Sequence, residues 1–285
     1  MLVSVVIPTY NMAAYVGQAI DSVLAQTFHD FEIVVVDDGS TDGTPELLAQ
    51  YGPRVRVLRQ PNRGGAGALN AGIRAGRGEW IAWLSADDLW EPRKLEKEVE
   101  AARRFPHAAL VYTDYVYVDA SGKALSLEHF PLPSTRRRTL LRLFRRCFVN
   151  GSTTLIRRDV FDAVGFFDEA DRYAPDWDMW FRIAASYDFA HVPEALVRYR
   201  IHGAQTSARG DVMERAARRV FAKNVRRVSR PLAVQAVVRG AAFQFRTFPA
   251  FVRESVGHHR TIRRQLRDLV EWLVVLVDPE TSRIA

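Results

Sequence analysis

Short apolar runs alternate with amphipathic segments along the first ninety residues of the chain. The apolar runs predict buried strands and cover Val3–Ile7, Phe31–Val36, Val55–Leu58 and Trp80–Leu84. Between them, apolar positions recur at helical spacing, with Asn11 and Thr44 expected as helix caps and a further helix expected over residues 66–75. This order predicts an α/β fold, in which a mostly parallel central sheet is flanked by helices.

The later pattern is more mixed. It predicts a charged helix over Pro92–Phe105, an alternating strand over Ala109–Val118 that opens a more antiparallel region, and an aromatic helix over Trp177–Tyr187. A last strand is expected over Ala195–Arg200, and the pattern beyond residue 206 is helical and basic. We therefore expect one catalytic-type domain over residues 1–205 and a helical C-terminal extension over residues 206–285.

Composition excludes several kinds of site and segment. The 285 residues include one cysteine, Cys147, which excludes an internal disulfide and a cysteine-based zinc site. No run approaches the roughly 18 apolar residues of a membrane span, and the apolar start is too short for a signal peptide. A cytoplasmic protein is expected, with the oligomeric state left open.

The net charge of +7 is concentrated in the extension. Residues 206–285 contain 16 Lys and Arg against 7 Asp and Glu, whereas residues 1–205 contain 24 against 26. The front of the chain therefore lacks the basic surface of a nucleic-acid binder. The extension could be a solvated bundle packed on the domain, or it could attract an anionic membrane surface, to which the basic segment Arg136–Arg146 would add.

Two predicted strands end in paired carboxylates, Asp37-Asp38 and Asp87-Asp88. Ligands of open α/β sheets bind beyond the carboxyl ends of the strands. Adjacent carboxylates repel each other, and a divalent cation carrying a diphosphate would compensate them. Solvated acidic turns are the competing interpretation. A phosphate-binding P-loop and a Gly-x-Gly-x-x-Gly after the first strand are both absent, which weighs against a kinase or a dinucleotide oxidoreductase.

Seven motifs, in this order, resemble family 2 glycosyltransferases of the GT-A fold. They are Ser4–Asn11, Phe31–Ser40, Asn62–Gly72, Gly78–Trp90, Val164–Glu169, Pro175–Arg182 and Tyr199–Gln205. The resemblance implies transfer of a sugar, with inversion, from a nucleoside-diphosphate sugar that is most commonly UDP-linked in this family. It implies a divalent metal, Mn²⁺ or Mg²⁺. We expect the acceptor to be a glycan or lipid-linked glycan of cell-surface polysaccharide synthesis.

The resemblance also implies site residues. The nucleotide is expected at Pro8, Thr9, Tyr10, Asn11, Asp38, Asn70, Ser85, Ala86 and Asp87, with Tyr10 packing on the base and Asp38 reading it. From the residues alone, Tyr10 could equally be a core aromatic and Asp38 part of an ordinary turn.

The metal is expected at Asp87, Asp88 and His202. Asp87 matches the metal-binding Asp of the family's Asp-x-Asp motif, whereas Ser85 replaces its first Asp, so metal binding should depend more on Asp87 and a later ligand. From the residues alone, His202 could be an ordinary histidine of the surface or core.

Asp176 is the expected base, with Asp178 as the second candidate, because an inverting displacement needs a carboxylate to take the acceptor proton. The family's Glu-Asp pair here reads Pro175-Asp176. Asp176 could also cap the helix that follows it.

Two other classes of protein compete with this interpretation. A sugar nucleotidyltransferase shares the α/β layout but would need a basic Gly-rich loop after the first strand, which Pro8–Asn11 lacks. A non-catalytic nucleotide-sugar-binding protein would fit the departures at Ser85 and Pro175.

Overall fold

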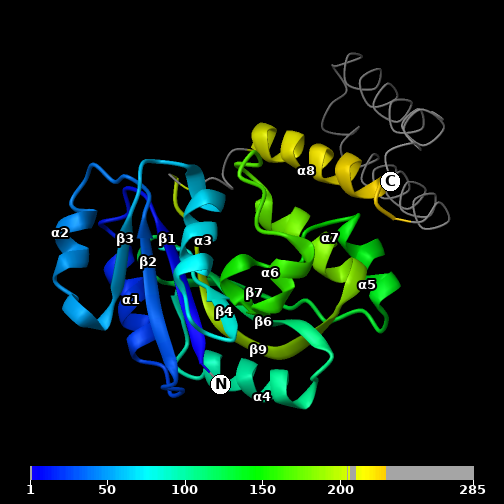
Figure 1. The fold of residues 1–285 in the computed structure, drawn as a ribbon, viewed down its shortest axis with the longest axis horizontal. Coiled ribbons are helices and arrows are strands. Elements are labelled where there is room, and N and C mark those ends of the chain that lie inside the picture. Colours follow the sequence, from blue (N-terminus) through cyan, green and yellow to red (C-terminus); the bar gives the residue numbers. More distant parts are fainter. Residues whose placement is uncertain (1, 204, 206–209, 229–285) are drawn as a thin grey trace.

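The computed structural model describes residues 2–203, 205 and 210–228, which form a central sheet flanked by helices (Figure 1). Its first half contains β1 (Val3–Thr9), α1 (Val16–Leu24), β2 (Phe31–Asp37), α2 (Thr44–Ala49), β3 (Arg56–Arg59), α3 (Gly64–Ala75) and β4 (Trp80–Trp83). Its second half contains β5 (Leu89–Trp90), α4 (Lys94–Arg104), β6 (Ala108–Val118), β7 (Ala124–Glu128), α5 (Arg136–Leu143), β8 (Thr154–Arg157), α6 (Asp159–Val164), α7 (Pro175–Ser186), β9 (Asp188–Arg200) and α8 (Gly210–Val225). The predicted α/β class is confirmed.

The strands form one sheet in the order β3-β2-β1-β4-β8-β6-β9-β5, with β7 paired to β6. The pairs β1–β2, β1–β4 and β2–β3 are parallel, so β1, β2 and β4 end at the same edge. β8 runs antiparallel between β4 and β6, and β6 and β9 are parallel. The topology thus gathers the ends of the first strands beside the second half of the sheet.

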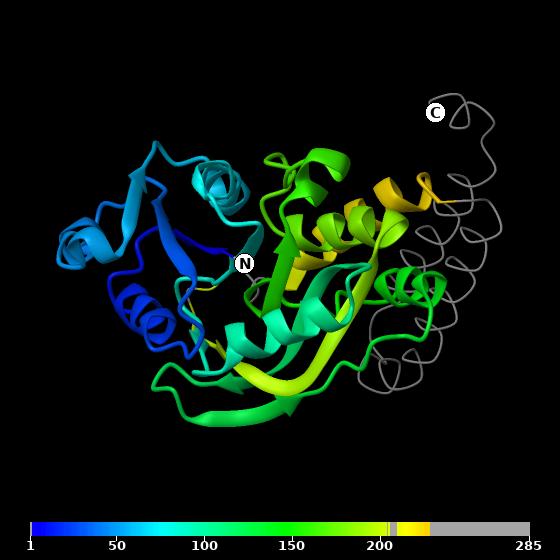
Figure 2. The same cartoon turned by 60° about the horizontal axis from the view of Figure 1, so that its bottom comes forward.

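Helices cover both faces of the first half, as Figure 2 shows for α1 and α3. Along β2, Ile33 and Val35 join the core cluster that contains the apolar face of α1, whereas Val34 and Val36 pack with Ala68 of α3. This alternation is the side-chain period of a strand buried on both faces. A Cβ on Gly72 would lie 2.3 Å from Cγ1 of Val6, so glycine lets α3 pack directly on β1.

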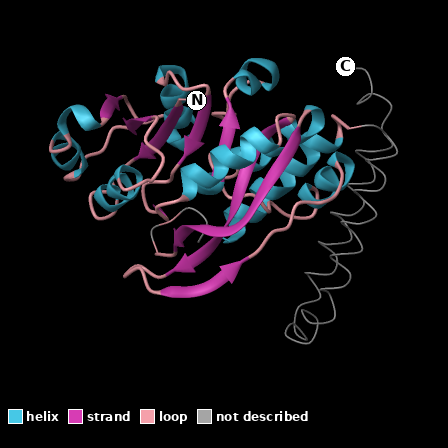
Figure 3. Cartoon of the chain, turned by 90° about the horizontal axis from the view of Figure 1, so that it is seen from below, coloured by secondary structure: helices cyan, strands magenta, loops and turns pink. Residues whose placement is uncertain are grey.

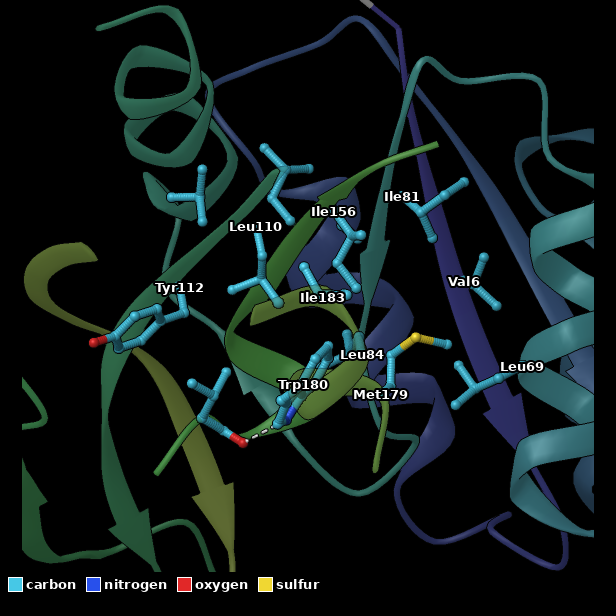
Figure 4. Packing of buried hydrophobic residues seen from close by; sticks show 14 of the residues in the cluster. Val6, Leu69, Ile81, Leu84, Leu110, Tyr112, Ile156, Met179, Trp180 and Ile183 are labelled. Carbon is cyan, nitrogen blue, oxygen red and sulfur yellow. Dashed lines mark hydrogen bonds between the residues drawn. The ribbon is translucent and has the colours of Figure 1, made fainter. Parts of the chain in front are cut away.

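The main core continues under α7 (Figure 4). Met179 and Trp180 of α7 lie in one cluster with Leu84, which follows β4. Trp180 is fully buried, and its Nε1 donates to the carbonyl of Val149 at 3.0 Å. These contacts fix α7 against the segment that leads from β4 to Asp87.

β7, which pairs with β6, forms an exposed margin of the sheet, seen along the bottom of Figures 2 and 3. β6 itself is buried because it pairs with β9 from Ala108↔Asp188 to Val118↔Arg200. The sequence pattern predicted only the second half of β9 and did not predict β5 or β7.

The two expected helix caps are wrong. Asn11 has a φ of 52°, and its side-chain oxygen accepts from the Thr41 amide at 2.8 Å. Thr44 is the first residue of α2, and its hydroxyl accepts from the Met12 amide at 3.0 Å. Both side chains therefore bind the neighbouring loop instead of their own helix, and they join the loops that follow β1 and β2.

The last described helix, α8, packs on the body of the molecule. Its Ala216, Val220, Phe221 and Val225 belong to the main core cluster, and the rings of Phe221 and Phe144 are 5.1 Å apart. The predicted division after residue 205 falls just before this helix. Within the described part of the chain, no helix combines the length and apolarity needed to cross a bilayer. Residues 229–285, most of the predicted extension, lie outside the described residues.

Candidate active site

The segments that leave β1 and β2 are fixed to each other at the edge where these strands end. Thr9 pairs with Asp37, and its carbonyl accepts from the Asp38 amide at 2.9 Å. The Asn11 amide donates to Ser40 Oγ at 2.9 Å. Gly39, with a φ of 81°, allows the sharp turn after β2. The expected nucleotide-binding segments are thus held together before any ligand arrives.

Two side chains at this edge have unused binding capacity. Thr9 Oγ1 is buried and has no hydrogen-bond partner among the described residues. Tyr10 is 45% exposed, so it is not the core aromatic that the sequence left open. Pro8 lies inside β1, paired with Val36, and offers only its carbonyl.

Asp38 holds the loop between β3 and α3. Its Oδ1 accepts from Gln60 Nε2 at 2.7 Å and from the Arg63 amide at 2.9 Å, while Oδ2 accepts from the Gly64 amide at 2.7 Å. The carboxylate is 2% exposed. A base that binds to Asp38 would have to use carboxylate oxygens that already accept hydrogen bonds from the loop before α3 and from the first residue of α3.

Asn70 and the short segment before Asp87 also have defined partners. The Asn70 amide group donates to the Phe167 carbonyl at 2.9 Å and to Glu169 at 3.0 Å, and it accepts from the Phe167 amide. The Ser85 amide donates to Ser152 Oγ at 3.0 Å, and Ala86 is buried. These residues shape the site through the backbone and through the loop after α6.

Asp88 is buried and fully engaged. Its Oδ2 accepts from Ser152 Oγ at 2.6 Å and its Oδ1 from the Arg200 amide at 3.0 Å. Burial and the neighbouring charge of Asp87 raise the pKa of Asp88 well above its usual value, although both hydrogen bonds oppose that rise. The side chain joins the turn after β4 to the segment before β8 and to the end of β9.

Asp87 faces a different environment. Its side chain is 20% exposed, and Oδ2 lies 3.1 Å from Nε2 of His202. The His202 ring packs on Tyr15 with centroids 4.9 Å apart, and the His202 amide donates to Gln205 at 2.7 Å. Residues 87 and 202 are therefore brought together from the two halves of the sheet.

Arg200 holds in place the segments that carry Asp87 and His202. Its guanidinium donates to the carbonyls of Asp87 and Ala120 and to Gln18 Oε1 at 2.8–2.9 Å, and it stacks over the Tyr15 ring. The side chain is 2% exposed. One buried cation thus fixes α1, the Asp87 turn and the end of β9 in a single arrangement.

The Asp87–His202 pair fits a divalent metal. A carboxylate oxygen and an imidazole nitrogen lie close enough to share one ion, and Asp87 remains accessible. Within the described residues, Asp88 does not form a three-residue ligand cluster with this pair.

Asp176 occupies the first turn of α7, close to Cys147 and Asp171. Burial, with the charge of Asp171 adding, raises the pKa of Asp176 to about 6, against the amides of Trp177 and of Asp176 itself. A carboxyl group with this pKa exchanges a proton near neutral pH, which suits a general base.

Asp178, the second candidate for the base, is an ion-pair centre. Its Oδ2 lies 2.9 Å from Arg182 Nε and 3.0 Å from Lys223 Nζ, and its Oδ1 accepts from Asn224 at 3.1 Å. The pKa of Asp178 is lowered: burial acts to raise it, but Lys223, Arg182 and Asn224 together outweigh that effect. This carboxylate connects α7 to α8.

Sequence reasoning missed the supports of the acidic pair. Ser152 and Gln18 lie in a predicted strand and a predicted helix but carried no functional signal, because their roles depend on contacts far away in sequence. Arg200 stands inside the recognised Tyr199–Gln205 motif, two residues before His202. Its place in that motif was the one feature of the sequence that could have identified Arg200 as a site residue.

Comparison with known proteins agrees with this architecture. The family model described as Glycosyl transferase family 2 matches residues 4–165. An uncharacterized glycosyltransferase of Rickettsia prowazekii is 36% identical over 211 residues, covering 72% of this chain and 66% of the relative. Chondroitin synthase of Escherichia coli is 32% identical over 212 residues, covering 72% of this chain and 30% of that protein. The chain thus spans less than two thirds of the length of these relatives.

Solved structures share the fold. S. aureus TarS residues 1–349 in complex with UDP-GlcNAc superposes with a TM-score of 0.69 at 18% identity, covering 97% of this chain and 82% of that one. Mannosyltransferase PcManGT from Pyrobaculum calidifontis, in complex with GDP-Man and Mn²⁺, superposes with a TM-score of 0.60 at 20% identity, covering 96% and 85%. With the fold confirmed as GT-A and more than half of the sequence matched by the family model, this chain belongs to glycosyl transferase family 2.

Proposed function

We propose that this protein transfers a sugar, with inversion, from a nucleoside-diphosphate sugar to a hydroxyl acceptor. The observation that carries the proposal is the Asp87–His202 pair, which Arg200 and Asp88 assemble from distant parts of a GT-A fold. Such a pair at a strand-end edge is suited to a metal–diphosphate complex.

In this proposal, Asp87 and His202 hold the metal that binds the donor diphosphate. The metal would supply Lewis-acid stabilisation of the leaving nucleoside diphosphate. We assign Asp88 no metal contact, because Ser152 and the Arg200 amide use both of its oxygens. Its proposed role is to hold the turn that carries Asp87.

Asp176 is the proposed base. It would take the proton of the acceptor hydroxyl as that oxygen attacks the anomeric carbon. The support is its raised pKa and the packing of α7 beside Leu84, close in sequence to Asp87. Asp178 is a weaker candidate, because its three basic neighbours, Arg182, Lys223 and Arg227, stabilise the ionised form.

The proposed donor is UDP-linked. TarS has been solved with UDP and with UDP-GlcNAc on a similar fold, whereas PcManGT was solved with GDP-Man. In the nucleotide site, Tyr10 is exposed for stacking on a base, and Thr9 Oγ1 is available to a ligand. We propose a glycan or lipid-linked glycan as acceptor, in keeping with the likeness to chondroitin synthase.

Thermal-shift measurements with UDP, GDP and dTDP, each with and without Mn²⁺, would test this function. We expect UDP to raise the melting temperature most, and only with Mn²⁺. Asp87→Ala should remove the Mn²⁺-dependent shift and turnover of UDP-sugars, whereas Asp159→Ala, a change at an exposed side chain at the start of α6, should keep both. Equal turnover in the Asp87 variant would refute the metal assignment. Nucleotide binding without any transfer would instead indicate a non-catalytic binding protein.

A further inference from the structure

Three potential metal ligands that the proposed transfer does not use meet on the second half of the sheet. Asp114 lies on β6, His191 on β9, and His129 directly after β7. His129 Nδ1 is 2.6 Å from Asp114 Oδ2, and His191 Nε2 is 2.9 Å from Asp114 Oδ1. One ligand atom from each residue lies within 4.8 Å of the others, the only such cluster among the described residues.

We propose that Asp114, His129 and His191 bind a divalent transition-metal ion of the Zn²⁺ type, separate from the donor-site metal. Two imidazoles and one carboxylate, with a fourth position left to water, form a common zinc ligand set. Tetrahedral bonds of about 2.0–2.1 Å place ligand atoms about 3.3 Å apart, so small side-chain movements would convert the present cluster into a coordination sphere.

The cluster is built on a rigid support. The Phe130 amide donates to Asp114 Oδ1 at 3.0 Å, and Tyr112 Oη donates to the Phe130 carbonyl at 2.7 Å. Arg142 donates to the next carbonyl, that of Pro131. These bonds fix the segment that carries His129 on the strand that carries Asp114. Outer hydrogen bonds of this kind orient metal ligands and strengthen their binding.

An ion would bind the cluster through ring nitrogens that now face Asp114. Binding would require each ring to move its proton to the other nitrogen. His129 is 55% exposed, so an ion can reach the cluster from solvent.

The competing interpretation is a hydrogen-bonded triad in which Asp114 only accepts from the two rings. Metal analysis separates the two. We expect the full-length protein with His258→Ala and His259→Ala, which remove the adjacent histidines of the C-terminal segment, to bind one equivalent of Zn²⁺ in excess Mn²⁺. With Co²⁺ as the probe, visible d–d bands typical of tetrahedral coordination should appear.

Variants assign the ion to these residues. In the same background, His129→Ala and His191→Ala should each weaken Zn²⁺ binding by at least about 10-fold, the smallest loss seen even for outer-sphere partners. His29→Ala, a change at an exposed histidine elsewhere, should leave it unchanged. Asp87→Ala should also retain the ion, because it alters only the donor site.

Zn²⁺ should also raise the melting temperature of the parent protein but not that of His129→Ala, because the ion binds only the folded cluster. His129 is exposed, so loss of binding in that variant cannot be ascribed to unfolding if its metal-free melting temperature is unchanged. Absence of stoichiometric Zn²⁺, or unchanged binding in both histidine variants, would overturn the proposal and leave the hydrogen-bonded triad.

Discussion

At the scale of single residues, Asp87 and Asp88 are neighbours with opposite surroundings. Asp88 is buried with both oxygens engaged, whereas Asp87 is partly exposed beside His202. Asp87 lies in the turn that the Asp88 amide closes on the Ser85 carbonyl at 3.1 Å, whereas Asp88 leads directly into β5, so the two side chains leave the backbone in different directions. The pair therefore combines one carboxylate that is accessible to a ligand with one that is engaged within the fold.

We predict that Asp88→Ala acts on stability. The change leaves Ser152 Oγ and the Arg200 amide without their acceptor, at a cost of about 1–3 kcal/mol for each unsatisfied buried group. Urea denaturation should show a clearly lower free energy of unfolding than in Asp87→Ala. Equal stability of the two variants would contradict the division of roles between Asp87 and Asp88.

A second prediction concerns pH. Asp176 must be ionised to act as a base, and its folded pKa is raised to about 6, so kcat/KM should increase as pH rises through about 6. Asp171→Asn keeps the oxygen that accepts from the amides of Tyr173 and Ala174 but removes a charge that raises this pKa. The rise in rate should then begin at lower pH.

Asp176→Asn provides the matching test. It should leave nucleotide binding almost unchanged and lower turnover by roughly 10²–10⁴-fold, the usual contribution of a general base. The variant should also lose the acidic limb of the pH profile. Turnover close to that of the unmodified protein would move the role to another residue.

At the scale of elements, one buried carboxylate connects α8 to α7, in addition to the apolar contacts of α8 with the core. Asp178 of α7 accepts from Asn224 and pairs with Lys223 and Arg227, all on or just after α8. We predict that Asp178→Asn destabilises the protein by about 3 kcal/mol, the low end for a broken buried ion pair, because Lys223 and Arg227 are partly exposed.

Proteolysis can localise that effect. Protease should cleave at α8 faster in Asp178→Asn than in the parent protein, while the Mn²⁺-dependent thermal shift with UDP remains. Asp168→Asn removes a second, more exposed partner of Lys223 and should have a much smaller effect on both stability and cleavage. Because the pKa of Asp178 is lowered in the fold, its stabilising contribution should be lost as pH falls through that lowered value.

The sequence predicted elements better than their connections. Strands β1, β2 and β4 follow from continuous apolar runs, and α1 and α7 from apolar or aromatic residues on one helical face, because burial on both faces or on one face leaves a local pattern. β5 and β7 were missed because the first has two residues and the second is exposed, so neither leaves such a pattern.

The partners within the site were not predictable in the same way. Motif order identified Asp87 and His202 as candidates, but the support of Asp88 by Ser152 comes from a residue 64 positions later. The expected caps Asn11 and Thr44 were wrong for a related reason. Each side chain accepts a hydrogen bond from an amide of a loop distant in sequence, and this bond replaces the local bond to its own helix that the cap prediction assumed. Long-range hydrogen bonds leave no periodic signal in a sequence.

At the scale of the whole molecule, charge is unevenly distributed along the chain, with the excess of Lys and Arg beyond residue 205. We predict that the full-length protein sediments with anionic liposomes at low salt and is released at high salt, because surface attraction is screened within about 8–10 Å at physiological ionic strength. A matched protein ending at Val228 keeps α8 on the core but loses residues 229–285, with their 9 Lys and Arg and 5 Asp and Glu, and should therefore sediment less at low salt.

The outcome decides between the two roles left open for the extension. Sedimentation of the full-length protein alone would support a lipid-linked acceptor reached from the membrane surface. If neither protein sediments, the basic residues belong to a solvated or protein-binding surface. If both sediment equally, the attraction arises from the described part of the chain, where Arg136–Arg146 is the first segment to neutralise.

The contacts of Asp87 and Asp88 also determine when this part of the protein can fold during translation. Asp88 accepts from the Arg200 amide, 112 positions later, and Asp87 contacts the His202 ring, 115 positions later, so neither contact can form before those residues are synthesised. At translation rates of about 5–20 residues per second, that wait is roughly 6–22 seconds. Parallel pairing of β6 with β9 imposes a similar delay on the sheet. The nascent protein therefore completes its sheet and its Asp87–His202 pair at the same late step, and a chain released before that step has neither of them complete.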